Sequence, residues 1–135
     1  MLIYTAERTT SFLFFQALGR PKNIIKEVSA MAWAYLILAG IFEIIWAYSM
    51  KMSEGFTKLT PSIITIIFMI LSFGLLAVAM KTLPLGTAYT VWVGIGAVGA
   101  FLIGIFFLNE PMGLLRLLAA ASIVFGVVLM KLTTN

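Results

Sequence analysis

Four long apolar stretches, separated by short segments, are the feature of this 135-residue sequence that most restricts its fold. A helix rises about 1.5 Å per residue, so about 20 apolar residues cross the roughly 30 Å of hydrocarbon in a bilayer. The separating segments contain proline, glycine or serine and are typical of turns. Helices satisfy their own backbone hydrogen bonds in lipid. We therefore predict an all-α membrane protein with four transmembrane helices, over residues 32–50, 59–80, 87–108 and 114–132.

The charge content excludes a soluble fold. Hydrophobic residues make up 62% of the chain and charged residues only 10%, whereas ordinary globular chains are about half apolar and a quarter charged. The sequence contains neither cysteine nor histidine, so we expect no disulfide, no thiolate or imidazole metal site and no Cys/His nucleophile–base pair. A soluble enzyme and a nucleic-acid-binding module are therefore excluded, and we expect neither a metal nor a cofactor.

Residues 1–30 do not share the pattern of the spans. Their charges follow a short apolar run instead of preceding it, which argues against a cleavable signal peptide. Residues 26–28 (Lys-Glu-Val) can be encoded by codons that contain the bacterial ribosome-binding consensus, two codons ahead of Met31. Our hypothesis is that residues 1–30 are a leader outside the working protein, which is a four-helix domain of residues 31–135. The alternative is that Lys-Glu-Val occurs there by chance.

The Lys and Arg residues at the ends of the spans indicate how the chain is oriented in the membrane. With four spans, both termini lie on the same side of the membrane. Outside the leader, one side carries Lys51, Lys58 and Arg116, and the other carries Lys81 and Lys131. Orientation follows the excess of Lys and Arg in short loops, and three against two is little excess. Such a chain can insert both ways and pair with itself as an antiparallel, dual-topology homodimer, although a small excess can also mean only that orientation is weakly specified.

Glu43 is the only ionisable side chain deep within a predicted span. A charge at that depth costs at least about 2.5–3.5 kcal/mol and usually marks the path of an ion, a proton or a substrate. Burial disfavours the charged form, so this carboxyl group can exchange a proton for a cation. The alternative is a protonated glutamate that bonds a neighbouring backbone. Helical spacing places Gly40 and Trp46 on the same face, as room and an aromatic wall for a ligand or as ordinary helix packing.

The third predicted span carries a second group of candidate residues. Tyr89, Trp92 and Gly96 share one face. A phenol can hydrogen-bond a carboxylate, and an indole can enclose a cation. Gly94, Gly96 and Gly99 make the helix easy to bend and allow close packing. Aromatic residues at the membrane interface, together with packing glycines, are the alternative interpretation.

Ser72 is the polar residue nearest the middle of the second span. Such a serine usually hydrogen-bonds the carbonyl four residues earlier in its own helix. We therefore expect that local bond first, and a functional role as the alternative.

Three segments together resemble a known family: residues 39–47 (Ala-Gly-Ile-Phe-Glu-Ile-Ile-Trp-Ala), 81–89 (Lys-Thr-Leu-Pro-Leu-Gly-Thr-Ala-Tyr) and 92–100 (Trp-Val-Gly-Ile-Gly-Ala-Val-Gly-Ala). The chain resembles the small multidrug resistance family along residues 31–135, and most closely its guanidinium exporter subtype. Gly40, Trp46 and Ser72 are similar to that subtype and differ from the subtype that exports polyaromatic cations. Val93 departs from the family pattern, where a smaller or hydroxylated residue is more usual.

The resemblance implies an antiparallel homodimer in the bacterial cytoplasmic (inner) membrane that exports guanidinium and related small cations in exchange for protons. In such exporters the glutamate matching Glu43, one per subunit, binds proton and substrate in competition. The residues matching Trp46, Ser72, Tyr89 and Trp92 line or order that site. The resemblance also assigns a dimer contact in the fourth helix, to Ser122 and Gly126.

Two other functions stay open at this point. The first is export of bulkier quaternary ammonium or hydrophobic cations, against which Gly40 and Trp46 argue. The second is a structural membrane subunit that transports nothing. The partners that we expect are a small organic cation, protons, the lipid bilayer and a second copy of the chain, with no nucleic acid.

Overall fold

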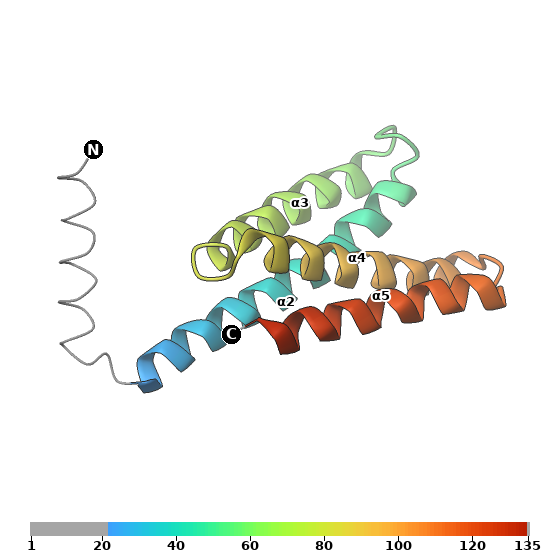
Figure 1. Ribbon diagram of the computed structural model, residues 1–135. Helices are drawn as coiled ribbons and strands as arrows, with labels where there is room; N and C mark the ends of the chain where they lie inside the picture. Colours follow the sequence, from blue (N-terminus) through green and yellow to red (C-terminus); the bar gives the residue numbers. More distant parts are fainter. Residues whose placement is uncertain (1–21, 135) are drawn as a thin grey trace, which may run out of the picture.

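The computed structural model describes residues 22–134, and within that part the chain forms four helices and no strand (Figure 1). The helices are long and apolar enough to cross a membrane. The prediction of an all-α fold with four membrane-spanning helices is confirmed. The bounds of the helices are α2 Lys22–Met52, α3 Leu59–Ala79, α4 Leu85–Leu108 and α5 Leu114–Thr133.

The start of the first helix differs from the prediction. We predicted a span that begins at residue 32, but α2 begins at Lys22 and continues without interruption to Met52. Neither proline nor glycine occurs between Lys22 and Gly40, so no residue in this segment ends the helix. At about 1.5 Å per residue, α2 is about 46 Å long. The last part of the proposed leader is therefore helical, and residues 1–21 lie outside the described residues.

The other three helices agree with the predicted spans to within two residues at each end. Local chemistry accounts for their limits. Pro84 precedes α4, where its missing N–H costs no helical hydrogen bond. Asn109 ends α4 in the left-handed conformation (φ 53°), which asparagine adopts more readily than most residues. The N–H of the next residue, Glu110, then donates a hydrogen bond of 3.0 Å to the carbonyl of Gly104.

α2 is the central helix of the bundle. It packs against both α3 and α4, whereas α3 and α4 touch each other little. α5 runs along α4 on the outer side of the bundle (Figure 1), and none of its residues is buried. The buried apolar core lies between α2, α3, α4 and the α3–α4 loop and consists of Ala32, Leu36, Ala39, Leu76, Ala79, Leu83, Ala88, Val91 and Trp92.

The outward faces of the helices are apolar. Large hydrophobic side chains are exposed along their length, for example Ile70 on α3, Phe106 on α4 and Phe125 on α5. A soluble monomer rarely exposes a continuous apolar surface of this extent. In a bilayer the same surface faces lipid chains, so the fold agrees with a membrane-embedded bundle.

Candidate functional site

Glu43 lies on α2, near the middle of the span, and is partly buried. The indole Nε1 of Trp46 donates a hydrogen bond of 2.8 Å to its Oε2 atom. The two residues are one helical turn apart, so the periodicity of α2 alone brings them together. Among the described residues, no other side chain donates a hydrogen bond to this carboxyl group. Glu43 therefore combines a fixed position with spare acceptor capacity for a ligand.

Gly96 of α4 makes the room that the Glu43 side chain occupies. A Cβ atom at Gly96 would overlap the Glu43 Cγ atom and would lie 3.4 Å from its Cδ atom. Any larger residue at this position would push the carboxyl group out of the interface between α2 and α4. The site thus depends on a glycine that the sequence analysis had singled out for packing.

The same interface contains two further glycines in a reciprocal arrangement. Ile95 of α4 fills the space above Gly40 of α2, and Ile44 of α2 fills the space above Gly99 of α4. The two helices therefore interlock on both sides of Glu43, because small and large residues exchange places between them. Gly94 faces the other way and receives Val127 of α5. Close packing by Gly94, Gly96 and Gly99 is thus observed.

Ser72 does not form the expected bond within its own helix. Its Oγ atom donates to the carbonyl of Ala39 on α2 at 2.7 Å and accepts a hydrogen bond of 3.0 Å from Trp92 Nε1 on α4. The expectation of a local bond is wrong, because α2 and α4 approach closely enough to offer a carbonyl and an indole N–H. Ser72 donates its single hydroxyl proton to Ala39, and its oxygen accepts the bond from Trp92. These two hydrogen bonds link α2, α3 and α4 one turn before Glu43.

The aromatic residues of α4 lie on the α3 side of this bridge. Trp92 is buried, and its ring centroid lies 5.4 Å from that of Tyr89 and 5.4 Å from that of Phe73. Tyr89 is exposed, and no hydrogen bond joins it to Glu43 among the described residues. The structure therefore brings together Trp92 with Ser72, and Glu43 with Trp46 and Gly96. Tyr89 reaches this group only through Trp92.

Ser122 and Gly126 lie on α5, away from the other candidate residues. Ser122 is exposed and bonds the carbonyl of Leu118 in its own helix. A Cβ atom at Gly126 would meet nothing within 4 Å. There is therefore open space beside Gly126, and the hydroxyl group of Ser122 is bonded within α5.

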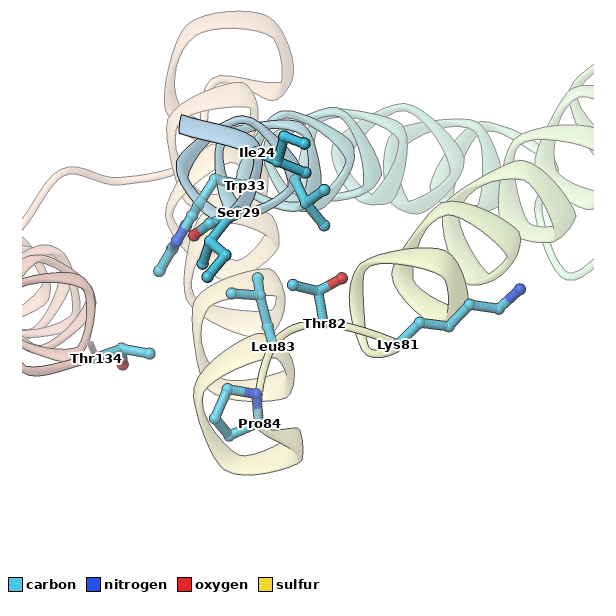
Figure 2. Close-up of a pocket in the computed structure, with 10 residues that line it drawn as sticks. Ile24, Ser29, Trp33, Lys81, Thr82, Leu83, Pro84 and Thr134 are labelled. Atoms are coloured by element: carbon cyan, nitrogen blue, oxygen red, sulfur yellow. The ribbon is translucent and has the colours of Figure 1, made fainter. Parts of the chain in front are cut away.

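Two cavities lie at opposite ends of the bundle. One of about 400 Å³ lies between the start of α2, the α3–α4 loop and Thr134 (Figure 2), remote from Glu43. A smaller one of about 190 Å³ lies between α2 and α4 and is lined by Ala47 and Ala100. These two alanines follow Glu43 and Gly96 by four residues, so the smaller cavity begins one turn from the carboxyl group.

Two residues contribute to the site that were not among the predicted ones. The carbonyl of Ala39 is the acceptor for Ser72, and Ile95 is the side chain that fills the space at Gly40. Ile95 carries a sequence signal, because a large and a small residue stand four positions apart on each helix: Gly40 and Ile44 on α2, and Ile95 and Gly99 on α4. The role of Ala39 carries no sequence signal, because every residue has a carbonyl.

Comparison with known proteins identifies clear relatives. The sequence profile of the family described as Small Multidrug Resistance protein matches residues 31–123. The chain is 51% identical over 105 residues to the Guanidinium exporter of Escherichia coli (strain K12), which covers 78% of this chain and 100% of that protein. It is 53% identical over 104 residues to the Guanidinium exporter of Proteus vulgaris, covering 77% and 100%. The Guanidinium exporter of Salmonella typhimurium is 52% identical over 105 residues, covering 78% and 100%.

Proposed function

The chain belongs to the small multidrug resistance family, and from this premise we propose that it exports guanidinium and related small guanidinyl cations in exchange for protons. Its relatives are named as exporters and not as enzymes, and the expectation that the chain is not an enzyme agrees with them. The observation that carries the proposal is Glu43, a carboxyl group in the middle of a span, held by Trp46 and seated on Gly96.

The chemistry of guanidinium fits this site. The ion is a planar fork of N–H donors that meets a carboxylate through two parallel hydrogen bonds. Trp46 occupies one side of Oε2, and the remaining lone pairs of the carboxylate are directed to the ligand. When the site is open, Gly40 and the rings of Trp46, Tyr89 and Trp92 would line the space around the flat cation, because in the single chain Ile95 fills the space at Gly40. The Ser72 bridge links α2, α3 and α4 beside this space.

Exchange follows from the use of one carboxyl group by two cations. Guanidinium binds the carboxylate. A proton that arrives from the outside then neutralises the carboxylate, and guanidinium is released. Guanidinium affinity should therefore fall as the pH is lowered. Bending of α4 at its glycines would let the interlocked face open first to one side of the membrane and then to the other by alternating access.

We further propose that the working unit is an antiparallel, dual-topology homodimer. α5 has no buried residue in the single chain, and its Ser122–Gly126 surface is free for the α5 of a second copy. Within residues 31–135 the cations at the two ends number three against two and specify orientation weakly. With the four cations of the leader the count becomes six against three, so this part of the proposal rests on a chain that begins at Met31. In the dimer the two Glu43 side chains would face one shared cleft.

The transporter domain in this proposal comprises residues 31–135, and the residues before Met31 are not needed for transport. The family match begins at the same residue. The four apolar spans place the protein in a membrane as a multi-pass protein, and we assign it to the bacterial cytoplasmic membrane, where a proton gradient can drive export.

The test is transport by purified protein in liposomes. Guanidinium is loaded inside, a pH gradient is imposed, and the loss of guanidinium is recorded for the wild type, Glu43→Gln and Glu54→Gln. Glutamine keeps the size of glutamate and can still accept from Trp46, but it cannot exchange a proton. Glu54 is an exposed loop residue paired with Lys58 and is the matched control. We expect proton-driven flux in the wild type and in Glu54→Gln, and none in Glu43→Gln.

A competition series defines the substrate. Guanidinium and methylguanidinium should inhibit flux at low concentration, and tetraphenylphosphonium should inhibit weakly. The reverse order would support an exporter of bulky hydrophobic cations, and proton-driven flux that survives in Glu43→Gln would refute the role of this residue. Absence of both binding and flux in the wild type would favour a subunit that transports nothing.

A further inference from the structure

The cavity of about 400 Å³ at the end of the bundle is built by parts of the chain that are far apart in the sequence (Figure 2). Its volume lies in the range of small-molecule sites. One wall belongs to the beginning of α2, the opposite wall to the α3–α4 loop, and Thr134 closes a third side. The lining residues are Ile24, Ile25, Val28, Ser29, Trp33, Lys81, Thr82, Leu83, Pro84 and Thr134.

Cations gather around this cavity. Lys81 stands at its edge, and in Figure 2 its side chain is directed away from the other labelled lining residues. Its flexible stem has to turn for the ammonium group to meet a ligand in the cavity. The Lys131 Nζ atom lies 5.2 Å from the centre of the Trp33 ring, which lines the cavity. The described lining residues include one lysine and no aspartate or glutamate. The surroundings therefore favour an anionic ligand.

The depth of the cavity is that of the lipid headgroups. It lies beyond the end of α3 at Ala79 and before the start of α4 at Leu85. α2 is about 46 Å long, which exceeds the roughly 30 Å of hydrocarbon and matches a bilayer with its headgroup layers. Tryptophan and lysine side chains are the groups that proteins place at this level. A ligand here would contact the headgroup layer and the first part of the acyl chains.

We propose that this cavity binds the headgroup of an anionic phospholipid. The phosphate would lie between Lys81 and Lys131, near the hydroxyl groups of Ser29 and Thr82. The apolar wall of α2, with Ile25 and Val28, would pack against the upper acyl chain. Basic pockets between membrane helices recognise anionic lipids in this way. The site is separate from Glu43 and does not depend on the proposed transport. It requires residues 24–29, so it belongs only to a chain that carries the helical end of the proposed leader.

The test is native mass spectrometry of the full-length chain, released from detergent micelles that contain phosphatidylglycerol or phosphatidylcholine with identical acyl chains. The wild type should retain phosphatidylglycerol in preference to phosphatidylcholine. Lys81→Gln and Lys131→Gln should each weaken phosphatidylglycerol binding about fivefold, which corresponds to about 1 kcal/mol for each lysine near the membrane surface. Lys51→Gln is the matched control, because Lys51 stands in the last turn of α2 at the opposite end and should leave binding unchanged.

A second measurement places the lipid. Phosphatidylglycerol with brominated acyl chains should quench the fluorescence of Trp33, so quenching should be smaller in Trp33→Phe than in the wild type. Equal retention of both lipids by the wild type, or equal retention of phosphatidylglycerol by the wild type and the Lys81→Gln Lys131→Gln protein, would overturn the proposal. Binding of water-soluble glycerol phosphate as tight as that of the lipid would also overturn it, because the site would then take free anions.

Discussion

The glycines between α2 and α4 are packed differently from the glycine on α5. A side chain of the opposite helix fills the space beside Gly40, Gly96 and Gly99, whereas Gly126 on α5 faces open space. The first interface also contains the Glu43 carboxyl group, and a hydrogen-bonded bridge from Ser72 spans it one turn away. α5 touches the bundle mainly through α4 and buries no residue.

This difference indicates a division of labour within the chain. Three helices form a closely packed unit that holds the proposed proton and substrate site, so a change there should affect transport directly. The fourth helix contributes little to that unit and offers a free surface, so a change there should affect assembly first.

The largest effect is expected at Gly96. Gly96→Val would place side-chain atoms where Glu43 now lies, so we expect loss of guanidinium flux and a decrease of about 1–3 kcal/mol in the free energy of unfolding. Flux in liposomes and unfolding in detergent measure the two effects.

Gly74→Val is the matched control for this change. Gly74 lies in α3 with nothing within 4 Å of a Cβ atom, so valine there should leave both quantities nearly unchanged. Normal flux in Gly96→Val would show that the close contact with Glu43 is dispensable.

The next effect is expected on α5. Gly126→Leu adds bulk to a surface that has room within one chain but would collide in a close contact between two helices. We expect dimer affinity to fall about tenfold, or about 1.4 kcal/mol, with the helix content unchanged. Energy transfer between labelled chains, diluted in lipid, measures the affinity. A dimer as tight as that of the wild type would place the contact elsewhere.

A smaller effect is expected at Ser72. Ser72→Ala leaves Trp92 Nε1 without its partner and removes the link to Ala39, so the free energy of unfolding should fall by about 1 kcal/mol. Ser72→Thr keeps the hydroxyl group and should recover most of this loss. If the Ser72→Ala protein has the same free energy of unfolding as the wild type, the bridge does not hold the three helices together.

The smallest effect is expected in the α4–α5 loop. Arg116 pairs with Glu110 at 2.9 Å, but the two side chains are 45% and 42% exposed. An exposed ion pair contributes at most about 1 kcal/mol, and Arg116→Gln should change the free energy of unfolding by less than that. A larger loss, measured by the same unfolding assay, would show that this loop supports the bundle more than its exposure indicates.

The sequence was sufficient for most of the fold, because the length of an apolar run and the turns between runs follow from the thickness of a bilayer. It was not sufficient for the start of α2. The bilayer thickness determines how many residues cross the membrane, but the helix continues beyond the membrane until a helix-breaking residue ends it. For the site, helical spacing correctly paired Glu43 with Trp46. It could not provide the bond from Ser72 to Ala39, because spacing along one helix gives the face of a residue but not its height against another helix.

The central claim is that guanidinium and a proton compete for Glu43. It is tested most directly by adding guanidinium to purified protein in weak buffer and recording proton release with a pH indicator, for the wild type, Glu43→Gln and Glu54→Gln. We expect proton release from the wild type and from Glu54→Gln, and none from Glu43→Gln. Guanidinium binding to the wild type without proton release, or unchanged release from Glu43→Gln, would contradict it.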